Sequence, residues 1–239
     1  MGKSVCFISG KGGVGKTTLA AALGKELAKT KKVLLVELDC GFRGLDLVLQ
    51  ESSILYHLQD NLSSDDPETG VCRQGNSGLY FLPAGNDTDY IPDVEKLRQR
   101  IRQFEQRYDI VLLDAPCGWG PSVRAACRAA DETVVVATPD AICVRGAETV
   151  SEMAWTMGAV KQRLIINMVR VEKPAENPIS DFDAILDLVA VPLLGVVPFD
   201  RQVHAGLGKK EDSGKPLYKE SIAAIAQRLQ GMQVPLKVG

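Results

Sequence analysis

The sequence predicts an α/β domain with a doubly wound, mainly parallel sheet and helices on both faces. Two observations support this prediction: short uninterrupted apolar runs recur along the 239 residues, and stretches of helical pattern separate them. A third is a glycine-rich segment between the first apolar run and the first helical stretch. Because no linker or internal repeat is visible, we expect one domain over residues 1–231 and a short tail over 232–239.

The apolar runs are expected to form the strands. Runs of this kind, without polar alternation, are typical of strands covered by helices on both faces. They occupy residues 5–8, 33–36, 79–82, 110–114, 134–136, 164–166 and 193–197.

The segments between these runs are expected to form the helices. In the segment 94–108, apolar residues repeat at intervals of three and four, which predicts one buried helix face. The last segment, 219–230, would bury Ile222, Ile225 and Leu229 in the same way. The other helical segments are 19–28, 121–130, 145–157 and 181–189. The polar segment 54–76 predicts only a short helix and loops.

The first glycine-rich segment matches a phosphate-binding loop. Gly10, Gly15, Lys16 and Thr17 satisfy the pattern G-x-x-x-x-G-K-[ST], with a strand before it and a helix after it. Small residues let backbone N–H groups surround phosphate oxygens, the lysine adds positive charge, and the threonine hydroxyl can reach Mg²⁺. The segment therefore predicts a nucleoside triphosphate site.

Acidic residues follow two of the expected strands. Asp114 ends the run 110–114, as an acid that holds Mg²⁺ in nucleotide hydrolases does. Asp39, with Glu37 as a less specific neighbour, follows the run 33–36 and could orient the attacking water. The alternative for each is an ordinary helix-capping or loop carboxylate.

Composition narrows the function class. Lys and Arg total 28 and Asp and Glu total 30, so the net charge of −2 gives no overall attraction to nucleic acid or anionic membranes. No apolar run is long enough for a membrane span or a secretion signal, so we expect a cytoplasmic protein. The six cysteines form no C-x-x-C pair, which favours free thiols over a zinc site.

Beyond these patterns, Lys11 followed by Gly-Gly-Val-Gly-Lys-Thr-Thr resembles the deviant phosphate loop of the MinD/ParA family of ATPases. The segments 38–46 and 114–118 resemble the two switches of that family, and 138–140 with 144–145 resemble its next strand end and helix start. The resemblance covers about residues 3–230, and it is stronger to the MinD branch than to the DNA-partitioning branch.

The resemblance implies an ATPase that uses ATP and Mg²⁺ and forms an ATP-dependent homodimer. Lys11 would reach the phosphates bound by the partner subunit, and Thr18 would contact the α-phosphate. The guanine-reading motif Asn-Lys-x-Asp is absent, because Asn167 is followed by Met-Val-Arg, so ATP is preferred over GTP. The residues expected at the nucleotide are Gly10, Lys11, Gly12, Gly13, Val14, Gly15, Lys16, Thr17, Thr18, Asn167, Pro198 and Asp200. Catalysis is expected from Lys11, Lys16 and Asp39, and metal binding from Thr17, Asp39 and Asp114.

Two departures from the family bear on the partners. The C-terminal residues contain glycine, proline and one lysine where membrane-binding relatives carry a basic amphipathic helix, so we do not expect direct membrane binding. A location peripheral to the inner membrane would then require a partner. The dimer would act as a switch for a protein activator or cargo that the sequence does not identify, such as a positioning or cell-division partner.

The cysteines are the second departure. Cys40, Cys117 and Cys143 follow expected strands on the nucleotide side of the sheet, where they could sense redox state or hold a metal cluster across a dimer. Cysteine as a small apolar substitute is the simpler interpretation. Alternative functions are therefore an iron–sulfur cluster carrier and a DNA-partition ATPase, although the overall charge makes DNA binding unexpected.

Overall fold

The computed structural model describes residues 2–51, 54–204 and 214–236. Within them lies an eight-stranded sheet with the strand order β3-β4-β2-β5-β1-β6-β7-β8. The strands are β1 (Lys3–Ser9), β2 (Val33–Glu37), β3 (Cys72–Arg73), β4 (Leu79–Leu82), β5 (Ile110–Cys117), β6 (Glu132–Ala137), β7 (Gln162–Val169) and β8 (Leu193–Pro198). Only β3 runs antiparallel to its neighbour in this described sheet, so the predicted mainly parallel fold is confirmed.

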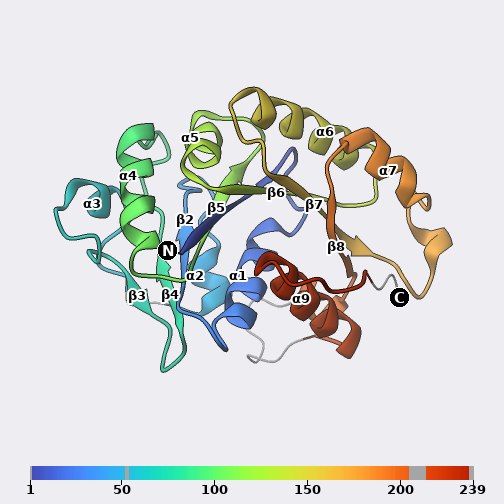
Figure 1. Cartoon of the computed structure of the whole chain (residues 1–239), viewed down its shortest axis with the longest axis horizontal. Coiled ribbons are helices and arrows are strands. Elements are labelled where there is room, and N and C mark those ends of the chain that lie inside the picture. The colour runs from blue at the N-terminus through green and yellow to red at the C-terminus, as the bar shows by residue number, and fades with distance from the viewer. Residues whose placement is uncertain (1, 52–53, 205–213, 237–239) are drawn as a thin grey trace.

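Helices cover both faces of the sheet (Figure 1). The face with α4 (Val94–Glu105), α5 (Pro121–Ala129), α6 (Ala141–Thr156) and α7 (Phe182–Val189) holds one apolar cluster. The other face holds a second cluster beneath α1 (Lys16–Leu27) and α9 (Pro216–Leu229). Shorter helices are α2 (Leu45–Leu49), α3 (Leu58–Ser63), the 3₁₀ turn η1 (Pro174–Glu176) and α8 (Arg201–His204).

Strand β1 shows why the apolar runs are uninterrupted. Cys6 and Ile8 lie in the cluster beneath α4 to α7, whereas Val5 and Phe7 lie in the cluster beneath α1 and α9. Successive side chains of a strand point to opposite faces, and both faces are buried here. The central strands therefore place the loops at their carboxyl ends on one rigid edge.

The last helix packs against the domain as expected. Ile222, Ile225 and Leu229 are all buried, and a Cβ at Gly195 of β8 would lie 2.5 Å from Ile225 Cγ1. The apolar face of α9 is therefore occupied by β8 and α1. In the described residues, no helix combines the length and apolar character that a membrane crossing requires.

The short elements differ from the expectation. Segment 54–76 contains α3 as expected but also the two-residue strand β3, and α2 and α8 appear where no helix was predicted. Helices α6 and α9 begin before their predicted starts at 145 and 219. Elements of two to five residues are too short to show a hydrophobic period, and a helix's first turn is set by its cap.

The division at residue 231 stays a prediction. Residues 232–236 of the expected tail have no regular secondary structure, and 237–239 lie outside the described residues.

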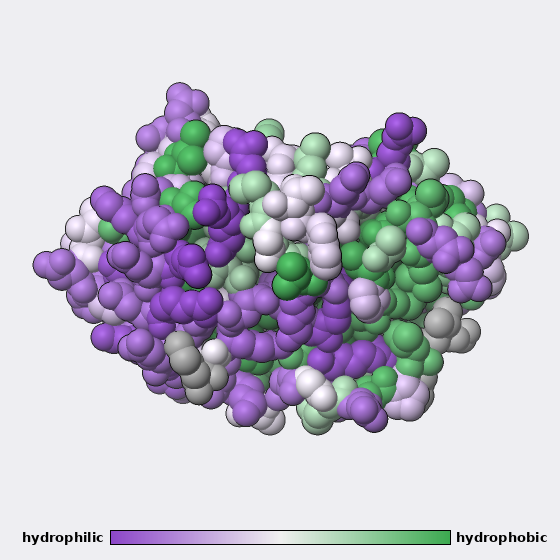
Figure 2. Space-filling view, turned by 45° about the horizontal axis from the view of Figure 1, so that its top comes forward, coloured by the Kyte–Doolittle hydropathy of each residue, from purple (hydrophilic) through white to green (hydrophobic). Residues whose placement is uncertain are grey.

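Figure 2 shows a largely hydrophilic surface at the end of the molecule that carries α3 and α4, and more apolar surface at the opposite end near α7. The exposed apolar side chains of the described residues include Trp155 on α6 and Leu188 on α7.

Candidate functional site

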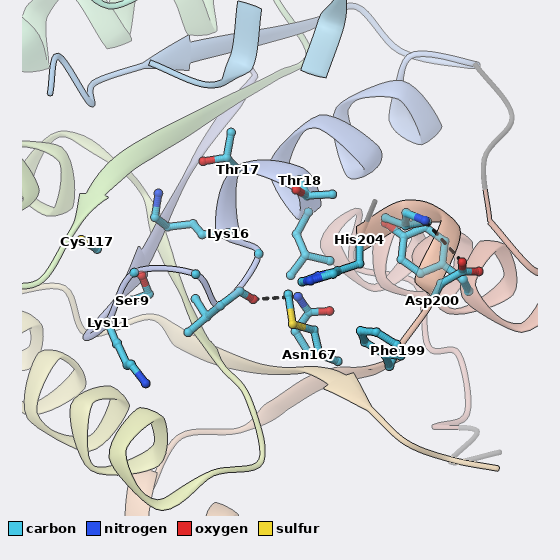
Figure 3. Close-up of a pocket in the computed structure, with 18 of the residues that line it drawn as sticks. Ser9, Lys11, Lys16, Thr17, Thr18, Cys117, Asn167, Phe199, Asp200 and His204 are labelled. Carbon is cyan, nitrogen blue, oxygen red and sulfur yellow. Dashed lines mark hydrogen bonds between the residues drawn. The ribbon is translucent and has the colours of Figure 1, made fainter. Parts of the chain in front are cut away.

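A pocket of about 490 Å³ opens at the carboxyl ends of β1, β5, β7 and β8 (Figure 3). In a parallel α/β sheet this edge is where ligands bind, because loops and helix N-termini converge there. Its lining includes Lys11, Gly12, Gly13, Val14, Gly15, Lys16, Thr17, Thr18, Asp39, Asn167, Pro198 and Asp200. Most of the residues expected at the nucleotide are thus brought together.

The loop between β1 and α1 has the backbone of an anion site. Gly13 and Gly15 have φ angles of 80° and 83°, which side-chain-bearing residues rarely adopt. No side chain caps α1, whose N-cap residue is Gly15, so the first N–H groups of the helix remain available to an anion. Ser9 also lines the pocket, and its buried hydroxyl has no hydrogen-bond partner among the described residues. The cradle therefore suits phosphate oxygens.

Lys16, Thr17 and Asp114 form one hydrogen-bonded group at the base of the loop. Lys16 Nζ lies 2.7 Å from Asp114 Oδ1, and Thr17 Oγ1 donates to Asp114 Oδ2 over 2.7 Å. The side chains of Lys16 and Asp114 are 7% and 1% exposed. The two carboxylate oxygens of Asp114 thus hold the side chains of the first two residues of α1. A hydroxyl beside a carboxylate is a donor set that fits Mg²⁺, and the lysine fits a phosphate.

Asp39 lines the pocket from the loop after β2. Its Oδ1 accepts from the backbone N–H groups of Gly41 at 3.1 Å and Phe42 at 3.0 Å, so the carboxylate also shapes its own loop. Asp39 therefore lies where its carboxylate could orient a water beside the phosphate loop. No hydrogen bond joins Asp39 to Thr17 among the described residues, and the role of Asp39 in metal binding stays a prediction.

Glu37 binds backbone N–H groups and so has a structural role. Its buried carboxylate accepts from the N–H groups of Gly44 at 2.7 Å, Leu45 at 2.9 Å and Ala84 at 3.3 Å. Burial raises the pKa of Glu37, and these backbone hydrogen bonds counteract part of that rise. Glu37 thus ties the start of α2 to the end of β4.

The other end of the pocket is built by β7, β8 and α8. Asn167 Nδ2 donates to Val14 O over 2.8 Å, which ties this end to the phosphate loop. Pro198 lines the wall, but the Asp200 carboxylate is engaged by backbone, accepting from Gln202 N at 2.8 Å and from Lys215 N at 2.5 Å. These hydrogen bonds keep the pKa of Asp200 low despite its burial.

The structure adds Phe42, His204 and Tyr218 to the residues expected at the pocket. Phe199 and His204 place their rings 5.5 Å apart, and Tyr218 lines the same end, so flat apolar surface is available for a base. Phe42 lines the mouth and is 88% exposed. Phe42 and His204 lie within four residues of Asp39 and Asp200, so proximity in the sequence could have indicated them. Tyr218 comes from α9, and no nearby motif indicates it.

Gly10 has a different role from the one expected. It is not among the described residues that line the pocket, and a Cβ on Gly10 would lie 2.2 Å from the carbonyl oxygen of Gly146. The glycine is therefore required for close packing of the phosphate loop on α6, since that contact is backbone to backbone. Its direct contact with a nucleotide stays a prediction.

Lys11 is exposed beside the pocket, and it makes no hydrogen bond or ion pair within the described residues. Asp140, the N-cap of α6, lies in its field: burial opposes ionisation, but hydrogen bonds from Cys143 and Thr138 and the charge of Lys11 lower the pKa of Asp140. The ammonium group is thus available to a second molecule.

The three cysteines that the sequence analysis named differ in their exposure. Cys117 lines the pocket and is exposed, whereas Cys143 is buried and Cys40 is half-buried. The described residues include no group of three or more His, Cys, Asp or Glu side chains placed to hold a metal ion.

Comparisons with known proteins agree with this site. The septum site-determining protein MinD of Synechocystis sp. is 34% identical over 248 residues, covering 98% of this chain and 92% of the relative. MinD of Bacillus subtilis is 32% identical, covering 100% and 92%. MinD in the MinC:MinD cell division protein complex of Aquifex aeolicus aligns with a TM-score of 0.87 and 30% identity, covering 98% of both chains.

The Pyrococcus horikoshii MinD complexed with Mg-ADP has a TM-score of 0.81 and 27% identity, with 96% of each chain covered. A family model described as the CobQ/CobB/MinD/ParA nucleotide binding domain matches residues 5–213, which include the phosphate loop and both acidic strand ends. The chain therefore belongs to the CobQ/CobB/MinD/ParA family of nucleotide-binding domains, among relatives named MinD.

Proposed function

We propose that this protein is a Mg-ATP-dependent, dimerising ATPase switch of the MinD type, which hydrolyses ATP to ADP and phosphate and so controls a positioning or cell-division partner. The observation that carries the proposal is the convergence of Lys16 and Thr17 on Asp114 beneath a glycine loop, with Lys11 left exposed beside it. Solved structures of a MinC:MinD complex and of a MinD complexed with Mg-ADP support the nucleotide and the kind of partner.

The chemistry follows from charge and position. Phosphoryl transfer needs groups that neutralise phosphate oxygens and orient the nucleophile more than it needs a strong base. Lys16 supplies a buried cation for the phosphates of its own subunit, and Asp39 orients water from the loop after β2. Mg²⁺ bound by Thr17 and Asp114 would add charge neutralisation at the phosphate oxygens.

Lys11 gives the proposal its dimeric character. Lys11 has no hydrogen-bond or ion-pair partner within the described residues, so its ammonium group is available to the phosphates of a second subunit, where it would stabilise negative charge as an arginine finger does. Each site of the dimer would then combine Lys16 and Asp39 of one subunit with Lys11 of the other. Hydrolysis in this arrangement depends on the dimer and returns the protein to monomers.

Light scattering tests the proposal. Wild type and the Asp39→Ala and Lys11→Ala variants are measured with Mg-ATP, Mg-ADP and no nucleotide, and Lys31→Ala serves as an exposed-lysine control. We expect Asp39→Ala to form a lasting dimer with ATP only, the control to behave as wild type, and Lys11→Ala to stay monomeric. A monomeric Asp39→Ala protein at saturating ATP contradicts the proposal.

The partner surfaces also belong to this proposal. We propose a cytoplasmic protein that reaches a membrane only through its partner, a view supported by the burial of the apolar face of α9. Iron in the anaerobically purified protein would favour the iron–sulfur alternative. DNA-stimulated hydrolysis that falls steeply with salt would favour the partition alternative instead.

A further inference from the structure

The phosphate-loop pocket contains an exposed thiol. All six cysteines lie within the described residues, and Cys117 is the one that is exposed. It ends β5 and lines the pocket with the phosphate loop. A Cβ built on Gly12 would lie 3.6 Å from Cys117 Sγ, so the thiol is in contact range of the loop backbone. Figure 3 shows Cys117 on the same side of the pocket as Ser9 and Lys16.

A second feature at this position points to an anionic ligand. Ser9 pairs with Cys117 across β1 and β5, and Ser9 is 1% exposed. Its hydroxyl lines the pocket without a hydrogen-bond partner among the described residues, so it has a donor to offer an incoming oxygen. Lys11, next to Gly12 in the loop, adds a cation without an ion-pair partner in the described chain. A thiol, a donor and a cation therefore share one part of the pocket.

The other thiols are less accessible. Cys6, Cys127 and Cys143 are buried, and burial raises the pKa of the half-buried thiols Cys40 and Cys72. Because the thiolate is the reactive form, burial makes these sulfur atoms poor nucleophiles at neutral pH. Selective reaction at Cys117 follows from its exposure.

We propose that Cys117 is a modification site for small anionic disulfides of the glutathione type, and that this mixed disulfide and a nucleotide exclude one another. The carboxylates of such a disulfide match the Lys11 cation and the N–H groups of the loop, which also serve phosphate. The inference rests on the proposed nucleotide site only for its consequence, namely that the modified protein cannot enter the ATP-dependent cycle.

The reaction balances as a thiol–disulfide exchange. The Cys117 thiolate attacks one sulfur of the small disulfide, a new S–S bond forms, and the original S–S bond breaks. The departing thiolate takes a proton from water, so the cysteine sulfur is oxidised and the leaving half is reduced. A free thiol reverses the reaction by the same exchange. The adduct then lies beside Gly12 where the phosphate loop must accept the nucleotide.

The test treats the full-length protein with glutathione disulfide and follows the mass of the intact protein. We expect one adduct, which peptide mapping places on Cys117, and which dithiothreitol removes. The Cys117→Ser variant, or Cys117→Ala if the first folds poorly, should lack the adduct, whereas the matched control Cys40→Ser should react as wild type. A first adduct on another cysteine, or unchanged modification of both Cys117 variants, overturns the proposal.

Nucleotide exclusion is measured separately. With Mg-ATP at ten times its Kd, about one molecule in eleven is unliganded, so modification should slow about tenfold. The purified adduct should lose binding of a fluorescent ATP analogue, and reduction should restore it. An adduct that binds the analogue as tightly as unmodified protein contradicts the exclusion. Failure of unmodified protein to bind ATP contradicts the proposed function instead, while the mass result still decides the modification site.

The ligand class is tested with a neutral probe. Lys11→Ala should slow the reaction with glutathione disulfide several-fold and leave the reaction with uncharged 2-hydroxyethyl disulfide unchanged. Equal effects on both probes would show that charge does not select the ligand, and would overturn the anionic part of the proposal.

Discussion

Glu37 is the buried carboxylate whose loss should show how the loop that carries Asp39 is held. It is 1% exposed and accepts three backbone hydrogen bonds, from Gly44, Leu45 and Ala84. Glu37→Ala removes the acceptor and leaves these N–H groups without their partner. Glu37→Gln is the matched variant, because its single amide oxygen can still accept from Gly44 and Leu45.

The expected magnitude comes from the two short hydrogen bonds. An unsatisfied buried donor costs about 1–3 kcal/mol, so two donors cost about 2–6 kcal/mol. Removing a buried carboxylate recovers part of its desolvation free energy, which leaves a predicted loss of about 2–4 kcal/mol for Glu37→Ala and about 1 kcal/mol for Glu37→Gln. The hydrogen bond to Ala84, at 3.3 Å, contributes least.

Urea unfolding monitored by circular dichroism measures these free energies. The pKa of Glu37 is raised by burial in the folded state, so its ionisation favours the unfolded state. Its stability contribution is complete below the unfolded pKa of about 4.3 and is lost as pH rises through the folded pKa. The wild-type advantage over Glu37→Gln should therefore shrink as pH rises through this range. A loss below about 0.5 kcal/mol for Glu37→Ala would refute this account of the loop.

Two further predictions concern packing and charge. Gly10→Ala places a Cβ 2.2 Å from Gly146 O, so we expect the free energy of unfolding in urea to fall by about 1–3 kcal/mol. The control Gly120→Ala has open space around its Cβ and should change the free energy of unfolding by less than about 0.5 kcal/mol. Equal losses for the two variants would contradict the packing role of Gly10. Burial opposes ionisation of Glu132, but Lys3, Arg163 and Lys161 lower its pKa, so its contribution is present above about pH 4.3 and is lost as pH falls through the lowered pKa. Glu132→Gln should lower the free energy of unfolding by about 3 kcal/mol at pH 7 and reduce its decrease at acid pH, as measured by thermal unfolding. A variant that loses stability at acid pH as wild type does would contradict the role of these ion pairs.

Much of the fold was predictable because the central strands are buried on both faces. Runs such as 33–36 and 164–166 appear as β2 and β7, and the phosphate loop with Asp114 follows directly from residue spacing. The helix 94–108 was equally visible from its period and appears as α4, which ends at Glu105. Long regular elements with a buried face leave a pattern in the sequence.

The parts that could not be predicted depend on contacts between remote residues. The approach of Gly10 to Gly146 and the hydrogen bond from Asn167 to Val14 join segments more than a hundred residues apart. The same holds for Ser9 beside Cys117, and the ring of Tyr218 reaches the pocket from α9, far in the sequence from the phosphate loop. No local period records such contacts, so the phosphate-loop end of the pocket was predicted in detail, whereas the other end was predicted only at Asn167, Pro198 and Asp200.

A complementation assay tests the shared active site most directly. Lys11→Ala and Asp39→Ala are each expected to hydrolyse little ATP alone. In a mixed dimer, the subunit that keeps Asp39 receives Lys11 from the subunit that keeps it, so one complete site forms. When the two variants are combined before ATP is added, each mixed dimer has one of its two sites intact, so it should hydrolyse ATP at about half the rate of a wild-type dimer. A mixture no more active than the average of the two variants would contradict the account.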